Sequence, residues 1–346
     1  MEKKVLFVGE YPIDYGGITR KSSILFGELN KRYITKLINI NVKKHKKISF
    51  LISAIKLICF MGKYKNVVYC IDSHRMYALI RLQFIFFPKS LKNTIVVFSG
   101  GDISRLDGKS NRKTLSIIKK VKSVWVESWK YGEALHKMGF DNTVYYPNPR
   151  VLGVSIKPIQ YKNGSTLKLL YYSLISKDKG ALDVIEAVKK MNQEHDIYFS
   201  IDFYGRVDSQ IDQEFKTFIR NTDNANYKGM NDSKDINRYY SVLNSYDILL
   251  FPTQWRGEGV AGVCVEAKAA GIAVIASRHN TNSETIIEKN NEGLLIEKGN
   301  VQELVDTIKK LYFDSEFLNS LKQGSYESRK RYDVSGYDSL YSTCFQ

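Results

Sequence analysis

The sequence predicts an α/β protein of two domains, each built on a parallel β-sheet. The chain has 346 residues, which is long for one hydrophobic core and natural for two. Short, continuous apolar runs recur along it and alternate with longer segments of helical periodicity. Most of these runs end in small or polar residues, as buried parallel strands do at the edge of a sheet where ligands bind.

In the N-terminal domain, assigned to residues 1–155, we expect strands at 5–9, 34–40, 67–71, 95–98 and 123–127. A helix is predicted after Gly16 and Gly17, whose backbone amides can approach a phosphate or a sugar, although the pair can also serve only the turn. The apolar segment 48–61 is bracketed by lysines. It suits either a helix buried against the sheet or one lying in a lipid interface.

The C-terminal domain, assigned to residues 167–331, follows a linker at 156–166 that contains turn-forming residues. We expect its strands at 167–172, 198–204, 227–230, 247–251, 272–276 and 293–296, and helices at 181–191, 301–313 and 315–331. Apolar residues at helical spacing in the tail, residues 332–346, indicate that the tail crosses back to the first domain.

Composition excludes several classes of protein. With 43% apolar residues and six prolines, the chain is expected to fold rather than remain disordered. The first apolar run is short and is predicted to be a strand rather than a signal peptide. No run approaches 18 apolar residues, so no transmembrane span is expected. The cysteines lack metal-ligand spacing and are expected to be reduced thiols in a cytoplasmic protein; they are Cys59, Cys70, Cys264 and Cys344.

Charge is unevenly distributed between the two halves. Residues 1–150 contain 28 Lys and Arg and 10 Asp and Glu, a net charge of +18, whereas residues 151–346 contain 24 and 26, a net charge of −2. The basic half is expected to face an anionic partner, and a membrane surface, a pyrophosphate-containing acceptor and nucleic acid are the candidates.

The most informative stretch is residues 247–277, predicted to form strand, loop, helix and strand. The loop would place small residues and a helix N-terminus at the carboxyl edge of the sheet, which suits a diphosphate. It comprises Gly259, Val260, Ala261 and Gly262, with the adjoining Val263. Glu258 precedes this loop and Glu266 lies one turn into the helix. Because carboxylates repel phosphate, their expected partners are hydroxyl groups. A ligand with both phosphates and hydroxyls is a nucleotide sugar.

Glu258 and Glu266, eight residues apart and followed by an Ala/Gly-rich helix end and a strand, resemble the signature of the retaining glycosyltransferases of family 4 (glycosyltransferase group 1). This resemblance implies the GT-B fold, in which two Rossmann-like domains face each other across a cleft. It assigns the donor sugar to Glu258 and the ribose hydroxyls to Glu266. It also identifies Gly16 and Gly17 with the family's N-terminal glycine pair.

The resemblance is incomplete at two charged positions. Lys179 matches the family's lysine on the donor diphosphate, but Leu174 stands where an arginine is usual. Arg256 is either its replacement or a solvated loop residue. A histidine usual after the strand ending at 98 is also missing.

The segment that replaces this histidine begins at Ser99, and Asp102 is the expected substitute. His74, after another strand, is either a site residue or an ordinary polar residue. By resemblance, the loops at Gly205 and Arg206 and at Lys228 and Gly229 frame the nucleotide base.

Together these features predict a retaining glycosyltransferase that moves a sugar from a nucleotide-diphosphate sugar to a saccharide acceptor. The basic N-terminal domain favours a lipid-linked acceptor at the inner face of the cell membrane, with peripheral contact to anionic lipid, in bacterial surface polysaccharide synthesis. No Asp-x-Asp motif is present, and neither a metal nor a cofactor is expected. The alternatives are a GT-B nucleotide-sugar epimerase and a basic nucleic-acid-binding protein, the latter disfavoured because the 23 tyrosines are scattered.

Overall fold

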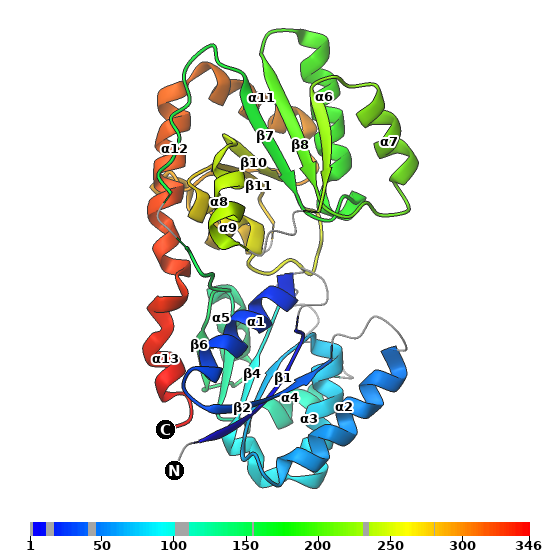
Figure 1. The fold of residues 1–346 in the computed structure, drawn as a ribbon, viewed down its shortest axis with the longest axis vertical. Helices are drawn as coiled ribbons and strands as arrows, with labels where there is room; N and C mark the ends of the chain where they lie inside the picture. Colours follow the sequence, from blue (N-terminus) through cyan, green and yellow to red (C-terminus); the bar gives the residue numbers. More distant parts are fainter. Residues whose placement is uncertain are drawn as a thin grey trace. The chain divides into compact units, whose positions relative to one another are not determined.

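The computed structural model describes residues 3–11, 17–40, 46–100, 111–153, 156–230, 235–279 and 281–346, with 46–49 described by their backbone alone. The chain divides into two compact units (Figure 1). Unit 1 comprises Met1–Arg150 and Val334–Gln346, and unit 2 comprises Val151–Asp333.

The described part of unit 1 contains a six-stranded parallel sheet in the order β2-β1-β3-β4-β5-β6. Its strands are β1 (Lys4–Gly9), β2 (Ile34–Asn39), β3 (Asn66–Cys70), β4 (Thr94–Val97), β5 (Ser123–Val126) and β6 (Thr143–Tyr145). The predicted strands are confirmed to within one residue at each end. The sequence prediction omitted β6, because three half-buried residues at the sheet edge carry little periodic signal.

Helices cover both faces of this sheet, and the side chains of β1 alternate between them. Val5 and Phe7 pack with α1 (Gly17–Asn30) and α13 (Asp338–Thr343). Leu6 and Val8 point to the opposite face, where the other helices lie. These are α2 (Lys46–Met61), α3 (Ser73–Phe86), α4 (Arg112–Ile118) and α5 (Trp129–Lys137), with the 3₁₀ turn η1 (Pro88–Asn93). Both faces are covered, as the continuous apolar strands require.

Helix α2 packs one of its sides against the sheet, as the first of the two expected alternatives requires. Ala54, Leu57 and Met61 are buried against the sheet, so α2 is a crossover helix between β2 and β3. Its outer side nevertheless exposes Leu51, Ile52 and Ile55 beside the exposed Lys56.

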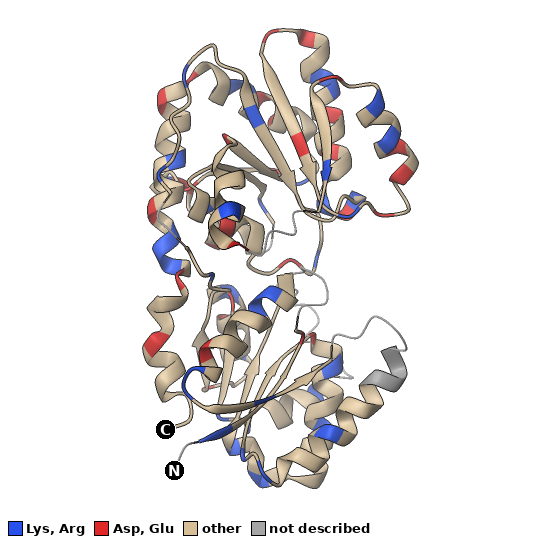
Figure 2. Ribbon diagram, viewed as in Figure 1, with Lys and Arg blue, Asp and Glu red and all other residues tan. Residues whose placement is uncertain are grey.

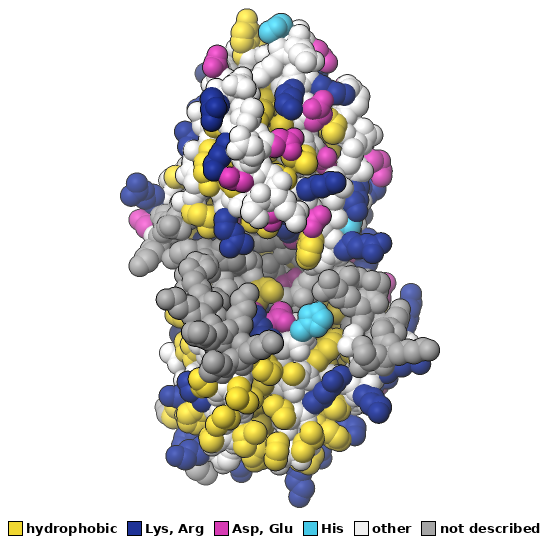
Figure 3. Space-filling view, turned by 90° about the vertical axis from the view of Figure 1, so that its right-hand side faces the viewer, with side chains coloured by type: hydrophobic (Ala, Val, Ile, Leu, Met, Phe, Trp, Pro, Cys, Tyr) yellow, Lys and Arg dark blue, Asp and Glu magenta, His cyan; other side chains and the backbone are white. Residues whose placement is uncertain are grey.

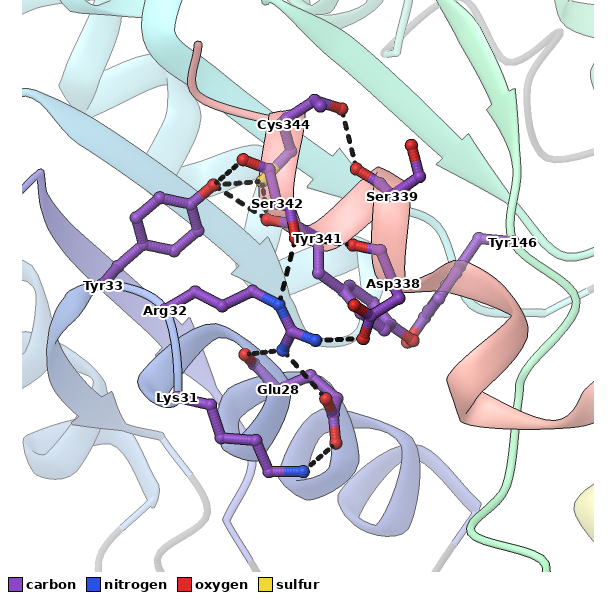
Figure 4. A network of polar contacts seen from close by, with 11 residues as sticks. Glu28, Lys31, Arg32, Tyr33, Tyr146, Asp338, Ser339, Tyr341, Ser342 and Cys344 are labelled. Atoms are coloured by element: carbon purple, nitrogen blue, oxygen red, sulfur yellow. Dashed lines mark hydrogen bonds and ion pairs between the residues drawn. The ribbon is translucent and has the colours of Figure 1, made fainter.

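The C-terminal segment packs on the α1 face of unit 1 (Figure 4). Arg32 forms an ion pair with Asp338, and the hydroxyl of Tyr33 donates to the carbonyl oxygens of Tyr341 and Ser342 at 2.8 and 2.9 Å. Tyr341 is fully buried, and burial raises its pKa, so its hydroxyl remains a neutral partner for that of Tyr146 at 3.0 Å. Residues more than 190 positions apart therefore share one core.

The described part of unit 2 contains a second six-stranded parallel sheet, ordered β12-β11-β10-β7-β8-β9. Its strands are β7 (Leu167–Tyr172), β8 (Phe199–Tyr204), β9 (Ala225–Gly229), β10 (Ile248–Phe251), β11 (Ala273–Ser277) and β12 (Leu294–Ile296). Its helices are α6 (Ala181–Glu194), α7 (Asp212–Arg220), α8 (Ile236–Asn244), α9 (Gly262–Ala270), α10 (Asn282–Thr285), α11 (Val301–Phe313) and α12 (Ser315–Ser328). Short 3₁₀ segments are η3 (Lys177–Lys179), η4 (Glu288–Asn290), η5 (Arg329–Tyr332) and, in the tail, η6 (Val334–Tyr337).

The segment between the two sheets is fixed to unit 2. Tyr161 is 5% exposed, and its N–H donates to Oδ1 of Asn319 in α12 at 2.8 Å. The Asn319 amide donates back to the Tyr161 carbonyl at 2.9 Å. The expected linker is therefore packed along a helix of unit 2.

No helix in the described ranges is both long and apolar enough to cross a bilayer. All four cysteines are free thiols.

Unit 2 contains a buried ion pair that connects α12 to the residue before β10 and, through it, to β7. Nζ of Lys322 in α12 lies 2.8 Å from Oδ1 of Asp247, whose other oxygen accepts from the Lys168 N–H at 3.0 Å. Lys322 is almost fully buried, and burial lowers its pKa. Removing one member leaves an uncompensated buried charge.

We expect Lys322→Met to lower the free energy of unfolding of unit 2 by about 3 kcal/mol, measured by urea denaturation. The control is Lys216→Met, which removes an exposed pair with Asp212 and should cost less than about 1 kcal/mol. Equal effects in the two variants would contradict the proposed importance of burial.

Candidate functional site

The carboxyl ends of β7, β10 and β11 lie side by side in unit 2, because these strands are parallel neighbours. Three loops leave the sheet at this edge, and they carry Lys179, Glu258 and Asn282. The topology therefore gathers residues that are up to about a hundred positions apart in the sequence. Such an edge is where open α/β sheets bind ligands.

Lys179 and Glu258 form an ion pair at this edge. Nζ of Lys179 lies 2.5 Å from Oε2 of Glu258, and the side chains are 20% and 12% exposed. The same oxygen accepts a hydrogen bond from Oγ1 of Thr253 at 3.1 Å. The two residues selected from the sequence are thus in contact. Thr253 and Lys179 together hold the Glu258 carboxylate, and sequence reasoning missed Thr253.

The loop that carries Lys179 is held by hydrogen bonds from β7 and from the loop after β10. The Tyr171 hydroxyl lies 3.0 Å from the Leu174 carbonyl and 3.1 Å from the Lys179 carbonyl. The Gln254 N–H donates to the Asp178 carbonyl at 2.8 Å. These bonds connect the loop after β7 to the loop after β10.

Gly180 allows the two loops to approach closely. Its φ is +75°, and a Cβ atom there would lie 2.1 Å from the Pro252 carbonyl oxygen. A side chain is excluded both by the left-handed backbone and by this contact. The glycine therefore sets the distance between Lys179 and the loop that carries Glu258.

The loop after β11 adds polar groups to the same edge. The Ser277 hydroxyl donates to the Thr253 carbonyl at 2.5 Å, and the Asn282 amide donates to the Ser277 carbonyl at 2.9 Å. Oδ1 of Asn282 and Oγ1 of Thr281 are buried without a hydrogen-bond partner among the described atoms. This edge thus retains unused hydrogen-bonding capacity among the described atoms.

Helix α9 begins at Gly262, as predicted, and no side chain caps it. Ala261 occupies the N-cap position, which usually takes Ser, Thr, Asp or Asn. The amides of Gly262 and Val263 begin the first turn, next to the buried Val260 and the half-buried Gly259. An uncapped helix start with its positive dipole end suits an anionic ligand.

Glu266 lies one turn into α9 and is 5% exposed. Its Oε2 accepts a hydrogen bond of 2.6 Å from the hydroxyl of Tyr239 in α8, which is also buried. The carboxylate is therefore oriented by a neutral donor rather than neutralised by a cation in this contact. Tyr239 is a second neighbour that the sequence pattern did not identify.

Burial and nearby charges shift the pKa of the Cys264 thiol in α9. Burial raises the pKa of Cys264, and Glu258 and Glu266 raise it further, while Lys268 and Lys179 oppose them. The thiol therefore stays protonated and serves as packing.

Two other predicted loops meet in unit 2. The Gly205 N–H donates to the Gly229 carbonyl at 2.8 Å, and the Tyr227 hydroxyl donates to the Gly205 carbonyl at 2.9 Å. Gly205 has φ +137°, and a Cβ there would lie 1.8 Å from the Ser173 carbonyl oxygen. Backbone geometry thus accounts for the glycine at 205.

The charged residues of these loops are exposed. Arg206 lies at the surface, and so does Arg256 in the loop after β10. Lys228 is 3.6 Å from Asp202.

The candidates in unit 1 are only partly described. Gly16 and Asp102 lie outside the described residues, and Gly17 begins α1. His74 is exposed in the first turn of α3. Oγ of Ser99 accepts from Lys21 Nζ at 3.4 Å.

Lys21 and Glu127 form a buried pair that the sequence analysis missed. Their charged atoms are 2.7 Å apart, and the side chains are 2% and 6% exposed. Lys21 also donates to the Phe98 carbonyl at 3.1 Å, so the pair fixes the ends of β4 and β5. The only signal available was Glu127 at the end of a predicted strand.

Within the described ranges, no three His, Cys, Asp or Glu side chains gather in a way that would hold a metal ion.

Comparison with known proteins shows which class has this architecture. HepE of Anabaena, solved in complex with UDP-glucose, has a TM-score of 0.72 over 98% of both chains at 14% identity. Sucrose-phosphate synthase of Thermosynechococcus elongatus has a TM-score of 0.73 at 13% identity, over 98% of this chain and 97% of that one. Two six-stranded parallel sheets with this likeness define the GT-B fold.

The sequence identifies the family within that class. Residues 155–328 match the family described as glycosyl transferases group 1, and the match spans half of the chain, so the chain belongs to this family. An uncharacterized glycosyltransferase of Methanocaldococcus jannaschii is 27% identical over 176 residues, 51% of this chain and 47% of that protein. The match thus spans about half the length of this curated relative.

We predict that Gly180→Ala destabilises unit 2 by more than the cost of a strained backbone alone. The matched control is Gly164→Ala, because Gly164 has φ +78° but nothing within 4 Å of an added Cβ. The control should cost about 1 kcal/mol, and Gly180→Ala about 2 kcal/mol more, because Pro252 must move. Urea unfolding of both variants measures the difference, and equal costs would show that the close approach at Pro252 has no energetic consequence.

Proposed function

We propose that the protein transfers a sugar from a nucleotide-diphosphate sugar to an acceptor hydroxyl, with retention of anomeric configuration. The observation that carries the proposal is the pairing of Lys179 with Glu258 beside the uncapped start of α9. A cation and a helix N-terminus suit a diphosphate, and carboxylates suit sugar hydroxyls. Membership of the glycosyl transferases group 1 family supports this reading of the site.

The donor would lie along the carboxyl edge of the unit 2 sheet. Its diphosphate would accept hydrogen bonds from Lys179 and the amides of Gly262 and Val263. Glu266 would accept from the ribose hydroxyls, with Tyr239 fixing its orientation. The loops at Gly205 and Gly229 would border the base. HepE, which shares the fold, is solved with UDP-glucose, and this supports a nucleotide-sugar donor.

In the proposed reaction, the bond between the anomeric carbon and the diphosphate oxygen breaks, and a bond from the acceptor oxygen to the same carbon forms on the same face. The acceptor proton passes to the leaving diphosphate oxygen. Lys179 and the α9 start stabilise the negative charge that develops on that oxygen. Glu258, fixed by Lys179 and Thr253, positions the donor sugar. These groups supply the stabilisation without a metal or a cofactor.

For the acceptor, we propose a lipid-linked saccharide at the inner face of a bacterial cell membrane, in surface polysaccharide synthesis. The net charge of +18 in residues 1–150 supports peripheral contact with anionic lipid. The protein would then be cytoplasmic and act at the membrane surface.

Glu258→Gln should lower kcat/KM for sugar transfer about 100-fold, because the carboxylate oriented by Lys179 and Thr253 would no longer hold the donor sugar. The substrate is first found by screening nucleotide sugars by thermal shift and mass spectrometry. The control is Glu186→Gln, which changes an exposed glutamate of α6 and should retain full activity.

Transfer at the wild-type rate by Glu258→Gln would refute the assigned site. Product analysis without acceptor distinguishes the epimerase alternative, which would convert the donor alone.

Glu266→Gln should weaken donor binding about tenfold, corresponding to the loss of about 1.4 kcal/mol, because an amide replaces an acceptor-only carboxylate. Tyr239→Phe removes the orienting hydrogen bond and should weaken binding by a smaller factor. Titration calorimetry with the donor measures both constants. Unchanged donor affinity in Glu266→Gln would contradict the assignment of this carboxylate.

A further inference from the structure

The outer side of α2 is unusual for a surface helix. Leu51, Ile52 and Ile55 are 60%, 46% and 54% exposed, and Cys59 is exposed one turn beyond Ile55. Residues 51, 55 and 59 are four positions apart and therefore lie on one side of the helix. A helix that is apolar all round is normally buried. In α2, only one side of the helix is buried.

The buried side of α2 supplies the contacts of this helix with the core of unit 1. Ala54, Leu57 and Met61 are 6%, 0% and 4% exposed and contact the sheet core. The exposed apolar residues therefore contribute nothing to this core, and they remain available to another surface.

The neighbouring helix α3 ends in two more exposed apolar side chains. Ile85 and Phe86 are 67% and 56% exposed. Helices α2 and α3 contact each other on the same side of the sheet. Figure 3 shows hydrophobic side chains gathered over this face of unit 1, with Lys and Arg at its margins. We call Leu51, Ile52, Ile55, Ile85 and Phe86 the α2–α3 face.

The charge around this face has one sign. Helices α2, α3 and α4 contain no Asp or Glu. Between positions 46 and 122, the described residues include 14 Lys and Arg and one carboxylate, Asp72. Asp72 forms an ion pair with Arg75 and caps α3, so it is already engaged. Figure 2 shows the basic residues along these helices.

The combination of exposed apolar side chains and one-sided positive charge matches an anionic lipid surface. Apolar side chains enter the boundary between headgroups and acyl chains, while lysines remain at the level of the phosphates. A second copy of this chain would place two positive faces against each other, which is unfavourable. Charge complementarity therefore selects the bilayer over self-association.

We propose that the α2–α3 face binds the surface of an anionic bilayer. This inference deepens the proposed function, because it assigns the membrane contact of the proposed acceptor reaction to one surface of unit 1. It can be tested without any turnover, because lipid binding and donor binding are measured separately.

The test is flotation of the full chain with vesicles of phosphatidylethanolamine and phosphatidylglycerol, compared with phosphatidylcholine vesicles. Wild-type protein should float with the anionic vesicles alone, and less so as salt rises. Leu51→Ser combined with Ile55→Ser should reduce the partition coefficient at least tenfold. The matched control is Phe313→Ser, which removes a 60% exposed aromatic side chain of unit 2 and should float as wild type does.

A second variant tests the charge contribution. Lys56, Lys63 and Lys89 are exposed in or directly after α2 and α3, and changing all three to Gln should reduce partitioning at least tenfold and flatten its salt dependence. Lys189→Gln with Lys216→Gln, both exposed in unit 2, is the control.

Flotation unchanged in the Leu51/Ile55 variant, absent for the wild type, or equal on both vesicle types would overturn the proposal. The proposal would also be overturned if light scattering showed a dimer of the wild type and a monomer of the Leu51→Ser, Ile55→Ser variant. Thermal unfolding and donor titration of each variant show that the units are intact. If lipid binding is lost and donor binding persists, the surface is confirmed independently of the transfer reaction.

Discussion

The contact between Lys179 and Glu258 depends on the pairing of two parallel strands, β7 and β10. A lysine after β7 and a glutamate after β10 meet at 2.5 Å because these strands are neighbours and end at the same edge. At 20% and 12% exposure, the pair is largely withdrawn from water, which strengthens its attraction but also makes each charge costly without its partner. Gly180 and the loop bonds around it keep both groups within reach.

This constraint explains why so many neutral groups surround the pair. Thr253 donates to the carboxylate, Ser277 fixes the Thr253 backbone, and Tyr171 fixes the Lys179 loop. Each is a hydroxyl group, which can donate or accept without adding charge. These hydroxyls fix the position of the Glu258 carboxylate, and Lys179 offsets its negative charge.

Much of the fold was predictable because buried parallel strands leave a strong signal. The apolar runs located the strands of both sheets, and the small residues before Gly262 located the start of α9. β6 was missed because three residues at a sheet edge have no distinct periodicity. The exposed side of α2 was not predictable either, because an apolar run does not reveal which of its side chains are covered.

The site was predictable only where residue type and spacing carry the chemistry. Glu258, Glu266 and Lys179 were selected because their types and spacing match the pattern of the resembling family, although a charged residue near a helix start is common in proteins. Thr253 and Tyr239 were missed since hydroxyls after a strand or within a helix are common, and only the fold brings them to the carboxylates. Lys21 and Glu127 are 106 positions apart, and no local pattern could pair them.

The central claim is that Lys179 and the start of α9 form the binding site for a nucleoside diphosphate. Calorimetric titration of Lys179→Gln with UDP, GDP and ADP tests it most directly, with Lys177→Gln, an exposed lysine two residues away, as the control. The account predicts that the diphosphate bound by the wild type binds at least tenfold more weakly to Lys179→Gln and equally well to Lys177→Gln. Equal affinity for all three proteins would contradict it.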